Sequence, residues 1–119
     1  MTTITDFAAA INFHDLERIA ALMSDDHTFI DAHGNETAGK ETMRAGWGSY
    51  FQLFPDYYIE IEEIFSKGDL AMAHGYAGAG TGEKAWKIPA AWRVIVRDGK
   101  IKLWQVYAET KIQFERIAK

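Results

Sequence analysis

Apolar residues recur at helical spacing in three segments of the chain. The first runs from about Thr3 to Ile11, and the second begins after Asp15, a residue type that caps helices, and stops near residues 24–26. The third begins at about Lys40 and stops at Pro55. The apolar positions are, in order, Ile4, Phe7, Ala8 and Ile11; Leu16, Ile19, Ala20 and Met23; and Met43, Trp47, Tyr50, Phe51 and Phe54. The pattern predicts three amphipathic helices.

The rest of the chain has the pattern of strands. One short strand, at about residues 29–34, precedes the third helix, and four follow it at about 58–65, 70–79, 85–96 and 101–109. The turns between the later strands are Lys67-Gly68-Asp69 and Arg97-Asp98-Gly99, the second a three-residue hairpin with a left-handed glycine. Helices gathered at the start and antiparallel strands at the end predict an α+β fold.

Side-chain size and hairpin register predict which faces of these strands are buried. In residues 70–79 large side chains alternate with alanine and glycine, and we expect the large ones to point inward: Leu70, Met72, His74 and Tyr76. A hairpin that pairs Val96 with Lys100 places Trp92, Val94, Trp104, Val106 and Ala108 on one face. The other face carries Ile95, Ile101, Leu103 and Tyr107, which the helices cannot cover, so we expect a homodimer through it.

Composition limits the classes of function. A chain of 119 residues fits one domain, 1–119, with a core of its own. Its formal net charge is −4 and its basic residues form no stripe, so the sequence lacks the basic surface expected of a nucleic-acid-binding protein. No apolar run is long enough to span a membrane. The lack of cysteine suits a reducing cytoplasm and leaves no thiolate for catalysis or metal binding. The 4 Trp, 5 Tyr and 7 Phe exceed what a small core needs and indicate a ligand cavity.

Asp31 is the main candidate for chemistry. It lies among Phe29, Ile30 and Ala32, and a carboxylate among apolar neighbours needs a partner or takes up a proton. Such a residue is a candidate general base. The alternative is that Asp31 opens the turn at Gly34-Asn35, where aspartate is common because it accepts hydrogen bonds from nearby amides. From this segment alone both interpretations stay open.

The order of elements, with several short motifs, resembles the nuclear transport factor 2-like (NTF2-like) superfamily in its SnoaL-like and ketosteroid-isomerase-like branch. The motifs that carry the resemblance are Asn12-Phe13-His14-Asp15-Leu16, Leu22-Met23-Ser24-Asp25-Asp26, Phe29-Ile30-Asp31-Ala32-His33-Gly34, Gly39-Lys40-Glu41, Phe54-Pro55-Asp56 and Arg97-Asp98-Gly99-Lys100-Ile101. The resemblance implies a cone, in which N-terminal helices pack in a curved, mostly antiparallel sheet that encloses an apolar pocket. It also implies dimers that form through the sheet.

The resemblance puts Asp31 where the steroid isomerases keep their general base. Their oxyanion hole uses a tyrosine and a protonated aspartate, and the matching positions here are Phe7 and Trp92, which offer neither a phenol nor a carboxylic acid. The related epoxide hydrolases use an Asp-Arg-Asp cluster, and Arg93 has no acidic residue two positions away. The resemblance therefore favours the pocket but neither of these two reactions.

Two classes of function follow. The first is a cofactor-free acid-base enzyme, of isomerase, cyclase or dehydratase type, that acts on a small apolar carbonyl compound, with Asp31 as base and His74 or Tyr76 as its proton partner. The second is a protein that holds a small apolar molecule without reacting it. Neither class requires a metal or cofactor, and the histidines show no paired ligand spacing. The expected substrate-binding residues are Trp47, Phe51, Met72, Tyr76, Trp92, Trp104 and Val106.

Overall fold

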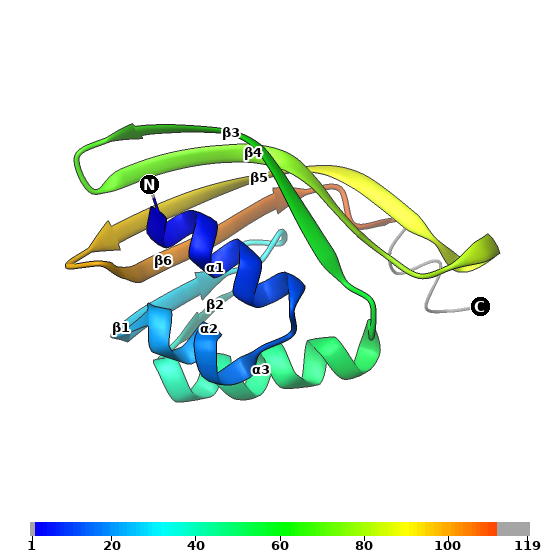
Figure 1. The fold of residues 1–119 in the computed structure, drawn as a ribbon, viewed down its shortest axis with the longest axis horizontal. Coiled ribbons are helices and arrows are strands. Elements are labelled where there is room, and N and C mark those ends of the chain that lie inside the picture. The colour runs from blue at the N-terminus through cyan, green and yellow to red at the C-terminus, as the bar shows by residue number, and fades with distance from the viewer. Residues whose placement is uncertain (1, 112–119) are drawn as a thin grey trace.

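A computed structural model describes residues 2–111 of the chain (Figure 1). In this part the helices are α1 (Thr2–Asn12), α2 (Leu16–Leu22) and α3 (Lys40–Leu53), with a 3-10 turn η1 (Gly82–Lys84). The strands are β1 (Met23–Ile30), β2 (Glu36–Ala38), β3 (Tyr58–Lys67), β4 (Leu70–Ala79), β5 (Trp86–Arg97) and β6 (Lys100–Ala108). The prediction of three helices and a C-terminal run of strands is confirmed.

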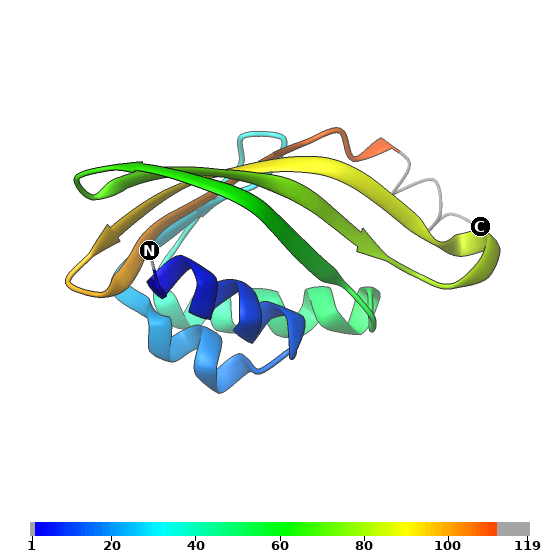
Figure 2. The same cartoon turned by 45° about the horizontal axis from the view of Figure 1, so that its top comes forward.

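The strands form one curved, mixed sheet in the order β2-β1-β6-β5-β4-β3. Among the strands of residues 2–111, only β1 and β6 pair in parallel; the other neighbours are antiparallel. Figure 2 shows the sheet as a bent layer with all three helices against its concave side. This is the predicted α+β architecture, but the sequence pattern did not reveal the short strand β2 or the parallel pairing. The prediction that placed Met23 in the second helix and began the first strand near residue 29 was wrong, because α2 ends at Leu22 and β1 begins at Met23.

The hairpin between β5 and β6 differs from the predicted one. Asp98 and Gly99 both have positive φ, 53° and 72°, and Arg97 pairs with Lys100, so the turn has two residues. A bulge then follows, because Val96 pairs with Ile101 but Ile95 pairs with Leu103. The extra residue turns Ile101 to the concave face, where it is fully buried. Its assignment to the outer face was wrong.

The prediction for the faces of β4 was also wrong. Ala71, Ala73, Gly75 and Ala77 are buried, whereas the large residues of the strand point to the convex side, with Leu70 and Met72 41% and 40% exposed. Alternating sizes show that a strand has two different faces but do not show which face is inside. Small residues on the concave side leave room for the helices and for a cavity.

The end of α1 is tied to the start of β3 by two side chains. Asn12 bonds both backbone groups of Ile59: its Nδ2 donates to the carbonyl at 2.9 Å, and its Oδ1 accepts from the amide at 2.7 Å. His14 Nε2 lies 2.7 Å from the Tyr57 carbonyl, and the His14 ring stacks on Phe51 with centroids 3.9 Å apart. These contacts fix the helical layer relative to β3.

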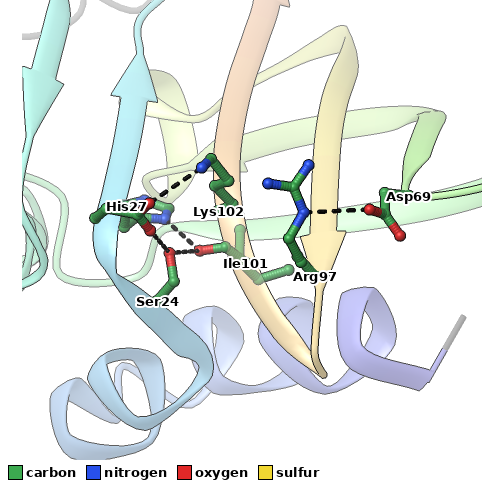
Figure 3. Close-up of polar contacts among 7 residues, drawn as sticks. Ser24, His27, Asp69, Arg97, Ile101 and Lys102 are labelled. Atoms are coloured by element: carbon green, nitrogen blue, oxygen red, sulfur yellow. Dashed lines mark hydrogen bonds and ion pairs between the residues drawn. The ribbon is translucent and has the colours of Figure 1, made fainter.

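His27 joins β1 to β6 where their pairing is irregular (Figure 3). Its Nδ1 lies 2.8 Å from the Ile101 carbonyl, which can only accept, so Nδ1 carries the proton of the ring. Nε2 is buried and has no hydrogen-bond partner. Burial is the main cause that holds the pKa of His27 below 6.5, although the bond to Ile101 and the charge of Asp26 oppose it. The neutral ring is thus part of the core.

The charged groups beside this junction lie on the surface. Lys102 Nζ donates to Asp26 Oδ2 at 3.0 Å, and Arg97 Nε donates to Asp69 Oδ2 at 3.2 Å (Figure 3). The second pair links the end of β5 to the β3–β4 turn, where the Val96 amide also donates to the Asp69 carbonyl at 2.8 Å. Exposed ion pairs of this kind contribute little individually, on the order of 0–1 kcal/mol.

The convex face of the sheet carries exposed apolar side chains. Phe65, Met72 and Tyr107 are 61%, 40% and 45% exposed, and Phe65 and Met72 are cross-strand partners on β3 and β4. None of these residues belongs to the buried core. We call Phe65, Leu70, Met72 and Tyr107 the outer apolar patch.

None of the helices within residues 2–111 is long and apolar enough to cross a membrane.

We expect the burial of His27 to make the fold sensitive to acid. The unfolded chain takes up a proton at His27 near pH 6.5, whereas the folded chain does so only at lower pH, so between these values the unfolded state binds more protons and stability rises with pH. Stability should therefore fall below about pH 6.5, at up to about 1.4 kcal/mol per pH unit for one proton.

Urea unfolding of the wild type and of His27→Asn between pH 5 and pH 8 measures this. Asparagine keeps an amide donor for the Ile101 carbonyl but cannot be protonated in this range. As the pH falls, the unfolding free energy of the wild type should decrease more than that of His27→Asn. Equal pH dependence in both proteins would show that His27 has no such effect.

Candidate functional site

A cavity of about 430 Å³ lies between α3 and the concave face of the sheet. This size is within the range of about 300–1,000 Å³ typical of small-molecule sites. Aromatic rings dominate its wall and include all four tryptophans of the chain. The aromatic lining residues are Phe29, Trp47, Tyr50, Tyr57, Trp86, Trp92 and Trp104. The site is therefore mostly apolar.

Several of these rings meet nearly at right angles. The ring of Tyr50 makes angles of 85° with Trp47 and 89° with Tyr57, with centroids 6.1 and 4.8 Å away. Trp86 continues this wall, 6.2 Å from Tyr57, and Trp92 and Trp104 lie 6.1 Å apart on β5 and β6. Residues from α3 and from the sheet thus contribute rings in different orientations. Burial raises the pKa of Tyr57 well above 10, so its phenol is neutral.

The polar part of the cavity wall has a single carboxylate, that of Asp31, among the described residues. The other polar side chains are His33 from the β1–β2 turn, Thr37 from β2, Thr42 from the first turn of α3, and Thr110 after β6. Thr110 Oγ1 and His33 Nε2 are hydrogen-bonded at 3.1 Å, which joins the turn to the segment after β6. No lysine or arginine among residues 2–111 lines the cavity.

Asp31 begins the β1–β2 turn instead of lying within a strand, because β1 ends at Ile30. Its Oδ1 accepts the amides of His33 at 2.8 Å and Asn35 at 3.0 Å, and its Oδ2 accepts Asn35 Nδ2 at 3.2 Å. The turn is therefore built around the carboxylate, as the alternative interpretation of the sequence expected. The same residue lines the cavity, so the two interpretations are not exclusive.

The turn keeps the Asp31 carboxylate ionised. Partial burial acts to raise the pKa of Asp31, but the hydrogen bonds from Asn35 and His33 together outweigh it, so the pKa lies below the usual value for aspartate. Each carboxylate oxygen has about two acceptor directions, and Oδ2 uses one for Asn35. Asp31 thus presents a negative charge, with acceptor capacity remaining on Oδ2, to a largely aromatic cavity.

The structure brings some of the predicted site residues together and separates others. Asp31, Trp47, Trp92, Trp104 and Val106 all line the cavity. Phe51 does not; it is buried between the His14 and Trp47 rings. Because β4 presents its small residues to the cavity, Met72, His74 and Tyr76 lie on the opposite face of the sheet.

The expected pairing of His74 with Asp31 is therefore wrong. His74 Nε2 lies 2.7 Å from Glu63 Oε1, and Nδ1 lies 4.0 Å from Glu62 Oε1, on the convex side. Within residues 2–111, acidic and histidine side chains do not form a group that could hold a metal ion. Asp31 has no histidine partner from β4 in the cavity.

Sequence reasoning missed several cavity residues, notably Tyr50, Tyr57, Trp86 and Ala77. Tyr50 belonged to the predicted apolar stripe of the third helix, but nothing in the stripe distinguishes residues that face a cavity from those that face the core. Tyr57 follows Pro55-Asp56, outside any periodic pattern. Ala77 lines the cavity because the small face of β4 is inside.

The family profile of the SnoaL-like domain matches residues 4–104, which is most of the chain. The chain therefore belongs to the SnoaL-like domain family, and its fold is that of the NTF2-like cone. No significant sequence match is found among curated proteins.

Solved structures show the same fold at low sequence identity. A protein of ketosteroid isomerase-like fold from Catenulispora acidiphila, in complex with trimethylamine, has a TM-score of 0.86 and 18% identity over 98% of this chain and 92% of that one. IdmH from Streptomyces antibioticus, described as a candidate polyketide cyclase, has a TM-score of 0.82 and 18% identity over 99% and 97%. An epoxide hydrolase of Mycobacterium tuberculosis has a TM-score of 0.84 and 16% identity over 98% and 87%.

We expect Asp31→Asn to destabilise the fold by about 1 kcal/mol at pH 7, because an amide can accept from the two backbone amides but not also from Asn35 Nδ2. A carboxylate with a lowered folded pKa contributes stability above its unfolded pKa of about 3.9 and loses this contribution as the pH falls through the folded pKa. The difference between the two proteins should therefore shrink below about pH 4.

Chemical denaturation at pH 7 and at pH 3.5 provides the measurement. Asp98→Asn is the matched control: it removes one exposed negative charge at a turn residue with positive φ, a conformation that asparagine tolerates. Unchanged or increased stability of Asp31→Asn at pH 7 would mean that the turn does not depend on the carboxylate.

Proposed function

We propose that this chain binds one small, mostly apolar molecule in the cavity under α3, with Asp31 as the polar group that the ligand meets. The observation that carries the proposal is the combination of a 430 Å³ aromatic cavity with the ionised carboxylate of Asp31, the one carboxylate that residues 2–111 contribute to its wall. Aromatic surface favours an apolar ligand, and one fixed polar group sets its orientation. The relative from Catenulispora acidiphila, which holds a small amine, is consistent with this use of the fold.

The bonding of Asp31 favours binding over catalysis. A carboxylate with three amide donors and a lowered pKa is a weaker base than one in an apolar pocket, and the expected partner His74 lies on the other face. Enzymes that use a carboxylate as a base commonly raise its pKa by burial. This geometry supports the role of an anchor for Asp31.

Proton-transfer catalysis is the second candidate, because Asp31 is ionised and borders the cavity with acceptor capacity on Oδ2. The description of IdmH as a candidate polyketide cyclase supports this possibility for the family. If a substrate that loses a proton is found, Asp31→Asn should reduce its turnover by about 10²- to 10⁴-fold. A smaller loss would leave Asp31 as an anchor alone.

Filling the cavity tests the binding proposal. Gly46, on α3, lines the cavity, and a Cβ added there would meet only the flexible Met43 side chain, at 3.6 and 3.8 Å, so the position accepts a side chain at the cavity wall. Gly46→Phe should weaken binding of the neutral fluorescent probe N-phenyl-1-naphthylamine at least about tenfold, because it occupies the ligand's space. Fluorescence titration measures the affinity.

Gly46→Ala is the matched control. It adds one methyl group, and because glycine in a helix costs about 0.5–1 kcal/mol relative to alanine, this variant should melt at a higher temperature and still bind the probe. A saturable signal from the wild type and Gly46→Ala, lost in a folded Gly46→Phe, supports the proposal. No binding to the wild type, or equal binding to all three proteins, contradicts it.

We also propose that two copies associate through the outer apolar patch. Its residues are too exposed for a face without a partner, and they lie on the side opposite the helices. Light scattering at micromolar concentration should give the mass of a dimer, and Met72→Lys should lower it. Leu53→Lys, which changes an exposed apolar residue outside the sheet, should have no effect. A monomer mass at all concentrations would exclude the dimer.

A further inference from the structure

The charges around the cavity are unbalanced. Asp31 makes no salt bridge with Lys or Arg of residues 2–111: its three hydrogen bonds come from neutral amides of the turn. Of the remaining cavity residues in the described range, only His33 and the two tyrosines are ionisable, and no lysine or arginine is present. Within residues 2–111 the cavity wall thus has the negative charge of Asp31 and no lysine or arginine to compensate it, and the group beside Asp31 that can become positive is His33.

The rest of the wall suits a positive charge as well. The face of an aromatic ring is negative and attracts a cation within about 6 Å of its centre, most strongly when the ring is that of tryptophan. Rings in several orientations, such as those of Trp47, Tyr50 and Tyr57, can surround a group from more than one side. A neutral apolar ligand would gain contact area from these rings but no electrostatic attraction.

We propose that the cavity selects small organic cations of the methylated ammonium class, with Asp31 as their counter-ion and the tryptophan and tyrosine rings as the cage. This inference rests on the proposed function, since it names the ligand class of the same site. A methylated ammonium group suits the wall because its methyl groups make it apolar in surface while its charge is spread over them. An anionic ligand would be repelled by Asp31.

The turn explains why the counter-ion is kept ready without a ligand. Three amide donors hold the carboxylate in place and lower the pKa of Asp31, so the charge does not depend on a bound cation. Because Oδ2 has one partner, it can face a cation without losing the bonds that build the turn. No free energy is therefore needed to ionise Asp31 when a ligand binds.

A pair of probes that differ only in charge tests the inference. Choline and its neutral carbon analogue 3,3-dimethylbutan-1-ol have nearly the same shape, and isothermal titration calorimetry can measure both at pH 8 and constant ionic strength, above the range in which histidine side chains ordinarily titrate. We expect choline to bind at least about tenfold more tightly than the alcohol. Asp31→Asn should reduce this preference to less than about threefold, and Asp31→Glu, which keeps the charge, should retain more of it.

The outcomes separate this inference from the proposed function. If the alcohol binds as tightly as choline, or more tightly, the selectivity for cations is wrong but the apolar cavity still binds ligands. If neither probe nor N-phenyl-1-naphthylamine binds, the proposed function itself fails. If a folded Asp31→Asn prefers choline as strongly as the wild type does, Asp31 is not the counter-ion and the proposal is overturned.

Discussion

The close approach of β3 and β4 at Gly75 is the constraint on which the shape of the molecule depends. A Cβ at this position would lie 1.8 Å from the Glu60 carbonyl oxygen, so only glycine fits. The pairing of the two strands shifts at the same place, between Ile61 and Glu63, where a bulge bends the sheet. The bend lies beside the small residues that β4 presents to the concave side of the sheet. The sheet therefore curves over the helical layer instead of lying flat (Figure 2).

The turn at Asp31 allows a charge to lie beside an aromatic cavity. An aromatic wall is favourable for burying surface, yet a charge beside it loses hydration. The chain supplies the replacement locally: Asn35 and His33 follow Asp31 closely in sequence, so their amides reach its carboxylate without any tertiary contact. The hydrogen bonds of the turn thus offset the hydration that the Asp31 carboxylate loses beside the cavity.

The helices could be predicted from the sequence because their apolar residues recur with a period that few other structures share, and Pro55 and Asp15 mark two of their ends. The strand faces could not. In β4, large and small residues alternate, and the same alternation fits either orientation until the curvature of the sheet is known. Ile101 was misplaced because the two-residue turn and the bulge beside it change the face of this residue, whereas Trp104 and Val106, beyond the bulge, lie on the predicted face. Asp31 could be identified as a candidate from the sequence. That it both builds the turn and lines the cavity depends on β1 ending one residue earlier, at Ile30, and sequence patterns do not fix a strand end to one residue.

The bonds between Asn12 and Ile59 have a consequence at the border of the sheet. β3 is an outermost strand, and such a strand exposes backbone donors and acceptors to which another chain can add. The Asn12 side chain occupies both groups of Ile59, much as the backbone of a neighbouring strand would. A helix residue therefore closes this part of the edge against the addition of a foreign strand. Protection against aggregation is thus built into the joint between the helical layer and the sheet.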